Sequence, residues 1–260
     1  RHHAVSLNVL KPGEMAATAG TSGVVYAVSD AIRFDPACRV NTFAHVNYTQ
    51  DSDRLGVLLC INGTGISNSW LKKTFRDPDL DYGEMNSMAQ QVGIGSDGLR
   101  FLPFGNGAER MLENRNIGAQ LHNLNFNMHS RAHLMRAVQE GVALAFKYGM
   151  DLMGDLGVRP KVIRAGCANM FLSPVFREVL AGVTGATIEL YNTDGAQGAA
   201  RGAAIGLGYY RSLDEAFHGL HRIRLIEPEE KLSQQHGDIY AGWLNCLNRA
   251  LEAQRVRPES

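Results

Sequence analysis

The sequence predicts an α/β domain, because strand-like and helix-like segments alternate within residues 161–210. Residues 161–165, KVIRA, and 187–191, TIELY, are short β-rich runs, and each is followed by a segment with helical periodicity. The composition agrees, since 45% of the residues are hydrophobic and 28 are glycine, as in a globular protein with a sizeable core and many turns. At 260 residues, the chain has room for one large domain or two small ones.

Glycines mark the ends of the segments within residues 161–210. Gly166 ends the first strand, and Asn169 opens a helix that Gly182 and Gly185 close. A second helix begins at Asp194 and consists largely of Ala and Gly. Each Gly costs a helix roughly 1 kcal/mol relative to Ala, so we expect a close neighbour there. Free N–H groups after Gly166, at the positive end of a helix, suit a nucleotide, but a tightly packed βαβ unit without a ligand fits equally well.

Charge and cysteine content narrow the classes of function. Twenty-six basic residues balance twenty-six acidic ones, so we expect neither nucleic acid nor an anionic membrane as a partner. We find no apolar run of membrane-spanning length and no signal peptide. The four cysteines lack CxxC spacing, which argues against a zinc site or a disulfide framework and favours a cytoplasmic location.

The N-terminal part predicts a β-hairpin with a polar turn. Residues 1–3 are interpreted as the remnant of an expression tag. Residues 14–19, 24–29 and 40–46 are β-type runs, and the first two are joined by Gly20-Thr21-Ser22-Gly23. The N–H and O–H groups of this turn can all donate to a phosphate, although a plain hairpin turn has the same sequence features.

The next part predicts a strand, a glycine bend and a helix. Residues 54–70 pass through Asn62-Gly63-Thr64-Gly65 into a helix that ends near Lys73. These glycines mark either a second backbone approach to a ligand or a simple bend. A short amphipathic helix follows over residues 81–92.

Residues 93–98 spell GxGxxG, but a helix precedes them and a strand at 99–104 follows. A dinucleotide-binding motif needs the opposite order, so we predict a loop. Residues 105–127 predict a long irregular loop, a kind of segment that is often functional. His129 and His133 have the spacing of metal ligands on a helix, but no third ligand lies nearby in sequence, and we predict no metal-ligand set.

Three more helices complete the prediction. The longest covers residues 130–153 with one apolar stripe, which places it centrally. A short helix follows near 213–220, and the final one runs from about 238 to 254 with an aromatic face that could cover a surface left by another lobe.

Several segments together resemble the FGGY family of carbohydrate kinases. They are the turn at 19–23 after a strand, FLPF at 101–104 followed by GAER at 107–110, HLMRAVQEGVA at 133–143, and the unit at 166–204. The resemblance runs from about Ser6 to Tyr210 and is closest to the branch that phosphorylates pentuloses such as D-xylulose. It implies residues 4–260 as the C-terminal lobe of a two-lobe kinase with a ribonuclease H-like, actin-like fold, a mixed sheet flanked by helices.

The resemblance also implies a nucleotide site for ATP with Mg²⁺ in the cleft between the lobes. Gly20, Thr21 and Ser22 would face the β- and γ-phosphates. Gly63 and Gly65 match a second glycine loop beside the nucleotide. The α-phosphate, ribose and adenine would lie against Gly166, Cys167 and Asn169, where the family usually has Gly-Gly in place of Gly166-Cys167.

No catalytic residue is assigned within the chain. The family's aspartate base precedes the apolar segment that leads to the phosphate hairpin, and no Asp occurs before Asp30, so we expect the base upstream of residue 1. We expect the sugar to bind through an N-terminal lobe and the C-terminal lobe alone to be inactive. A homodimer is compatible with the sequence. Alternatives are another kinase of the family acting on glycerol, ribulose or rhamnulose, an actin-like ATPase lobe of a chaperone or filament protein, or a non-catalytic interaction domain.

Overall fold

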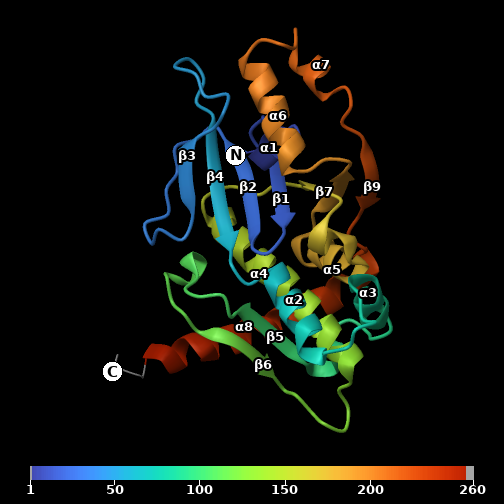
Figure 1. The fold of residues 1–260 in the computed structure, drawn as a ribbon. Helices are drawn as coiled ribbons and strands as arrows, with labels where there is room; N and C mark the ends of the chain where they lie inside the picture. The colour runs from blue at the N-terminus through green and yellow to red at the C-terminus, as the bar shows by residue number, and fades with distance from the viewer. Residues whose placement is uncertain (1, 256–260) are drawn as a thin grey trace.

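A seven-stranded mixed sheet forms the upper part of the molecule in the computed structural model, which describes residues 2–255 and the side chains of 4–254 (Figure 1). Its strand order is β3-β4-β2-β1-β7-β8-β9. The strands are β1 (Met15–Ala19), β2 (Gly23–Ser29), β3 (Asn41–Ala44), β4 (Leu55–Ile61), β7 (Val162–Gly166), β8 (Thr187–Tyr191) and β9 (Arg222–Ile226).

The five inner strands have the order of the ribonuclease H-like fold. Counted along the chain they lie third, second, first, fourth, fifth, because β4, β2 and β1 form an antiparallel meander and β7 and β8 pair parallel to β1. The carboxyl ends of β1 and β7 therefore meet at one edge of the sheet. This edge carries the predicted phosphate turn and the bend after Gly166.

Helices cover both faces of the sheet, as the alternation along β1 requires. Met15 and Ala17 belong to the main core, which includes residues of α4 (Arg131–Asp155) and α5 (Pro174–Thr184). Ala16 points to the other face, where it packs with residues of α1 (His2–Ser6). There α1 also contacts α6 (Gly195–Gly206) (Figure 1).

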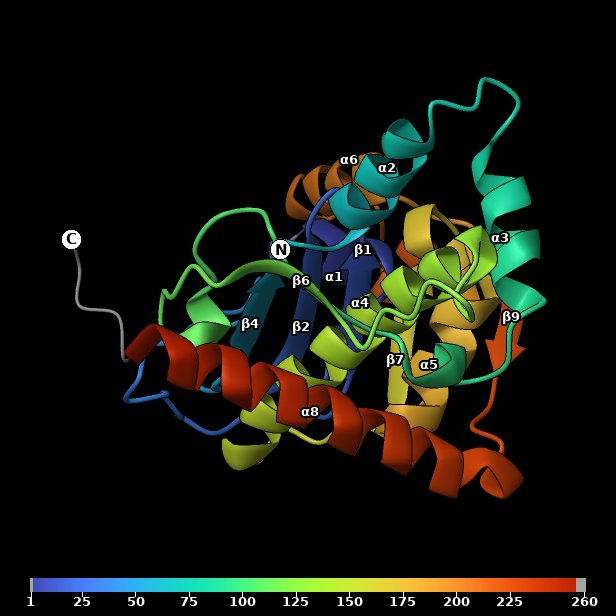
Figure 2. The ribbon, with the colours of Figure 1, turned by 90° about the horizontal axis from the view of Figure 1, so that it is seen from below.

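Helix α4 lies between the sheet and a two-stranded ribbon of β5 (Arg100–Phe104) and β6 (Gly118–His122) (Figure 2). Two glycines allow this placement. A Cβ on Gly141 would stand 2.3 Å from the carbonyl oxygen of Phe101 in β5, and one on Gly149 would stand 2.5 Å from Leu59 in β4. Residues 135–146 are all buried. The predicted single apolar stripe was therefore too narrow, because α4 has protein on all sides.

Helix α8 (Ser233–Arg255) crosses the ribbon, and its aromatic face is part of the core. Trp243 is fully buried, lies 6.0 Å from the ring of Phe104 and donates from Nε1 to the Phe101 carbonyl oxygen. The expectation that this face covers a surface left for another lobe was therefore wrong. The remaining helices are α2 (Gly65–Phe75), α3 (Tyr82–Gln90) and α7 (Leu213–Phe217), with 3₁₀ turns at 96–98, 110–112, 169–172 and 230–232.

Four further points need correction. Residues 105–127 are not one irregular loop, since β6 lies within them and pairs with β5. Strand β9 was missed because its side chains are mostly exposed, and α8 begins at Ser233 rather than near 238. Gly182 does not close a helix. It lies within α5, where a Cβ would stand 2.2 Å from the His236 ring of α8.

The small-residue helix α6 has a neighbouring helix along it, as expected. It packs on α1, but a Cβ on Gly202 would stand 3.7 Å from Val5, which is ordinary van der Waals contact. Gly198 is its one buried residue. Residues 1–3, the predicted tag remnant, lie partly outside the residues that the structure describes, and this interpretation stays a prediction.

Candidate functional site

A cavity of about 750 Å³ opens beside the carboxyl end of β1. Four of the predicted site residues line it, namely Gly20, Thr21, Gly65 and Asn169. A smaller hollow of about 120 Å³ shares Ala19 and Asn169 with it and includes Gly166. Three chain segments far apart in sequence thus meet at one place, although Gly63 lines neither hollow. The other residues lining the large cavity are Ala19, Ile66, Asn68, Ser69, Lys73, Tyr82, Gly83, Asn86, Met170, Leu172 and Ser173.

The hairpin turn is hydrogen-bonded to the start of α2. The N–H of Gly65 donates to the Gly20 carbonyl oxygen at 2.8 Å, and the N–H of Ile66 donates to that of Thr21 at 3.1 Å. A Cβ on Gly65 would stand 2.5 Å from the Gly20 oxygen, so only glycine fits this joint. The first donors of α2 are therefore used within the protein and are not free for an anion.

The hairpin itself keeps free donors. No hydrogen bond from the N–H groups of Thr21 or Ser22 is found within residues 2–255, and both residues are exposed. These N–H groups can bind a phosphate oxygen. Ser22 lies outside the residues that line the cavity, so any contact it makes would be at the rim.

Gly63 serves a structural purpose. A Cβ there would stand 1.4 Å from the carbonyl oxygen of Pro103 in β5, so the bend passes directly over the ribbon. Gly63 is buried and lines neither hollow. Its predicted contact with a nucleotide stays untested, and the close approach that its glycine permits is to another part of the backbone.

A buried carboxylate holds this bend. Glu109 is 1% exposed and accepts the N–H of Asn62 at 2.9 Å and that of Gly63 at 3.2 Å, both at Oε1. Burial raises the pKa of the Glu109 carboxyl to about 7, against the lowering effect of these two hydrogen bonds. The GAER segment thus reaches the site indirectly, through the bend that leads into α2.

The bend after β7 is also constrained from within. A Cβ on Gly166 would stand 2.5 Å from the Thr193 carbonyl oxygen, and the N–H of Cys167 donates to that of Tyr191 at 3.0 Å. Cys167 lines neither hollow. A 3₁₀ turn at 169–172 follows instead of the predicted helix, and α5 begins at Pro174 with Ser173 as its cap. The expected helix dipole at Gly166 is therefore absent from this position.

The lining of the large cavity fits a polar ligand. Asn68 is 6% exposed, and its Oδ1 has no hydrogen-bond partner among the described residues. Such a buried acceptor is costly unless a donor meets it, and a bound molecule that carries N–H or O–H groups can supply one. Met170 and Leu172 add apolar surface, which suits the face of a nucleobase.

Magnesium fits this lining less directly. No Asp or Glu lines the cavity, and within the described residues no group of three His, Cys, Asp or Glu side chains could hold a metal ion. Mg²⁺ prefers oxygen ligands and reaches nucleotide sites with the phosphates. His129 and His133 are engaged otherwise, since His129 accepts the Asn125 N–H and His133 contacts Asp97 at 2.9 Å.

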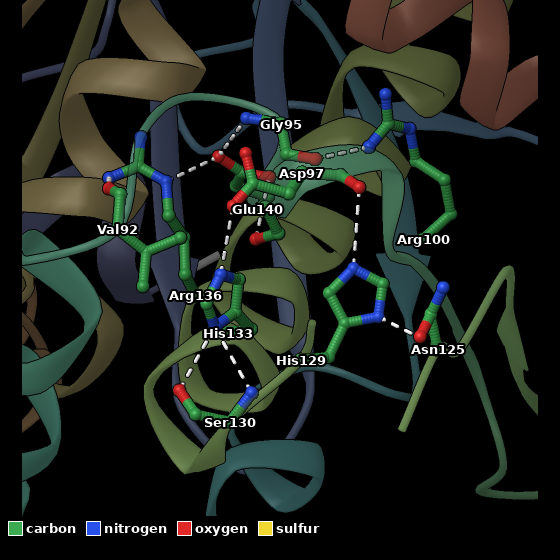
Figure 3. Close-up of polar contacts among 11 residues, drawn as sticks. Val92, Gly95, Asp97, Arg100, Asn125, His129, Ser130, His133, Arg136 and Glu140 are labelled. Atoms are coloured by element: carbon green, nitrogen blue, oxygen red, sulfur yellow. Dashed lines mark hydrogen bonds and ion pairs between the residues drawn. The ribbon is translucent and has the colours of Figure 1, made fainter. Parts of the chain in front are cut away.

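Polar side chains of helix α4 bind the segment that follows α3 (Figure 3). Glu140 accepts from Arg136 Nε at 2.7 Å and from the Gly95 N–H at 2.9 Å. Arg136 also donates to the Val92 carbonyl oxygen at 2.7 Å, just beyond the end of α3. The HLxRAxxE segment and the GxGxxG loop thus form one buried network. Residues 93–98 connect α3 to β5 and contain only a 3₁₀ turn, which agrees with the predicted loop.

Sequence reasoning missed the side chains that α2 and α3 bring to the site. Asn68, Tyr82 and Asn86 line the cavity, but the chain pattern marks them only as helix residues. For Asn68 and Asn86, the signal in the sequence was a polar residue within a helix. The structure has no helix, within residues 2–255, that is long and apolar enough to cross a membrane.

Comparison with known proteins agrees with this architecture. A family model described as "FGGY family of carbohydrate kinases, C-terminal domain" matches residues 15–210. A xylulose kinase of Haemophilus influenzae is 26% identical over 95% of the chain and 49% of that protein. A gluconokinase of Bacillus licheniformis is 26% identical over 95% of the chain and 49% of that protein.

The fold matches as well. The crystal structure of xylulose kinase from Rhodospirillum rubrum superposes with a TM-score of 0.82 at 24% identity, over 98% of the chain and 51% of that protein. The chain thus spans about half the length of the curated relatives it matches.

Proposed function

Because the chain belongs to the FGGY family of carbohydrate kinases, we propose that it is the ATP-binding C-terminal lobe of a sugar kinase. The observation that carries the proposal is the 750 Å³ cavity where the hairpin of Gly20 and Thr21 meets Gly65 and Asn169. The phosphates would lie against the free N–H groups of the hairpin turn. The nucleoside would lie between α2, α3 and the 3₁₀ turn at 169–172.

Phosphoryl transfer needs positioning, stabilisation of charge, and a base that accepts the proton of the sugar hydroxyl. The lobe supplies positioning and part of the charge stabilisation. Helix-end and amide contacts contribute at most about 2 kcal/mol each, whereas an enzyme lowers the barrier by roughly 8 kcal/mol or more. No carboxylate lines the cavity to act as base. We infer that a second lobe provides the base and the sugar pocket, and excludes water by closure.

The sugar is proposed to be a pentulose such as D-xylulose. The similarity to xylulose kinases supports this choice, and the similarity to gluconokinases makes gluconate the second candidate. Specificity of this kind depends on contacts with the sugar, which we assign to the other lobe.

The test combines binding and turnover. Calorimetry of this chain with MgATP should show weak binding, and a coupled assay for ADP should show no turnover with D-xylulose or D-gluconate. Absence of nucleotide binding by calorimetry and by thermal shift would contradict the ATP site. Appreciable turnover by this chain alone would show that the base has been misplaced.

A further inference from the structure

Gln139 of α4 connects two walls of the cavity from beneath. Its side chain is fully buried, and Nε2 donates to Asn86 Oδ1 at 2.9 Å. Ser173 Oγ donates to Gln139 Oε1 at 2.7 Å. Asn86 belongs to α3 and Ser173 caps α5, and both line the cavity. One buried amide therefore joins elements that are separated by more than eighty residues.

These bonds decide what each wall offers to a ligand. Asn86 Oδ1 accepts the hydrogen bond from Gln139, and no hydrogen bond from Asn86 Nδ2 is found among the described residues, so this donor is available to a ligand. The Ser173 hydroxyl is used twice, since it donates to Gln139 and accepts the Phe176 N–H at 3.1 Å. The α3 wall therefore offers a donor, and the Ser173 hydroxyl offers none.

The position of Asn86 matches the base end of a nucleotide. Helix α2 runs along the cavity from Gly65, at the hairpin, to Lys73, eight residues or about 12 Å farther on. The far half of α2 is next to α3, because the Lys72 ammonium lies 4.9 Å from the centre of the Tyr82 ring. If phosphates bind at the hairpin, α3 borders the opposite end.

We propose that Gln139 is a positioning residue for recognition of the nucleobase. It holds the Asn86 amide with Nδ2 toward an acceptor atom of a purine base, and it fixes the spacing between α3 and α5. This inference rests on the proposed nucleotide site and adds to it the residue that orients the base contact.

The test compares two probes on the same variants by calorimetry. MgATP carries base and phosphates, whereas inorganic tripolyphosphate with Mg²⁺ carries the phosphates alone. Gln139→Leu removes both hydrogen bonds and should weaken MgATP binding about 3- to 10-fold, the loss expected for one or two hydrogen bonds. Binding of Mg-tripolyphosphate should stay within 2-fold of the wild type.

A double-mutant cycle separates positioning from general loosening. In an Asn86→Leu background, Gln139→Leu should have little further effect on MgATP affinity. Val142→Ala, buried on the same helix without a bond to either wall, should lower the melting temperature and leave MgATP affinity unchanged.

Three results would overturn the inference. They are equal affinity of Gln139→Leu and wild type for MgATP, equal weakening of both probes, and additive effects in the cycle. A wild-type chain that binds neither probe would instead remove the proposed function, and this inference with it.

Discussion

Replacing Glu109 by Gln should change how the stability of the domain depends on pH. Glu109 is 1% exposed and accepts two backbone N–H groups at the bend before α2. No ion pair to it is found among the described residues. Burial raises the pKa of its carboxyl from 4.5 to about 7, so the folded state binds a proton that the unfolded state has already released.

The sign of the effect follows from this difference. Below pH 4.5 both states are protonated at this group, and between 4.5 and 7 the folded state binds more protons. Stability therefore falls as the pH rises through this window and levels off above it. A shift from 4.5 to about 7 corresponds to about 3 kcal/mol at 1.36 kcal/mol per unit, to order of magnitude.

Gln retains the acceptor for Asn62 and Gly63 without a charge. The free energy of unfolding should be measured by urea titration without nucleotide at pH 5 to 8. The difference between Glu109→Gln and wild type should grow in favour of the variant as the pH increases, by most of these roughly 3 kcal/mol. Glu252→Gln, at an exposed position of α8, should show no such trend. A difference between wild type and Glu109→Gln that is flat over this range, or that falls with pH, would refute the reasoning.

The remaining predictions concern packing at two other places. Gly63→Ala should lower the free energy of unfolding in urea by at least about 3 kcal/mol, because the new Cβ would stand 1.4 Å from the Pro103 oxygen. Gly237→Ala in α8, where a Cβ would have nothing within 4 Å, should be neutral or stabilise by up to about 1 kcal/mol. Equal effects of the two changes would contradict the geometry. Arg136→Met should lower the free energy of unfolding by about 3–5 kcal/mol, because it leaves Glu140 buried and unpaired. Arg131→Met, on the same helix as Arg136, breaks an exposed ion pair with Asp77 and should change the melting temperature little. The reverse order would show that the Glu140 network does not hold α3 in place.

The sequence predicted the backbone of the site better than its side chains. Hydrophobic periodicity and glycine position located β1, the hairpin, α2 and the unit from β7 to α6, because these signals are local. Strand β6 was not predicted from the sequence because it has polar residues and pairs on one side only. Its structure depends on pairing with its partner β5.

The meaning of the glycines also depended on the fold. Gly63 and Gly166 were predicted to contact a nucleotide, and that prediction stays untested. The structure shows that each lies against a carbonyl oxygen of the protein. A glycine in a sequence shows that something comes close, but the identity of the neighbour depends on contacts across 27 residues for Gly166 and 40 for Gly63. The hydrogen bonds of Gln139 to Asn86 and Ser173 could not be predicted for the same reason, because they form only when α3, α4 and α5 pack together.

The burial of α4 on all sides has a consequence for how the domain unfolds. Sheet and ribbon share one continuous apolar cluster through this helix, so the ribbon has no separate interior of its own. A protease cut between β6 and α4 would not release two stable halves, and heat should melt the sheet and the ribbon together, in a single cooperative step.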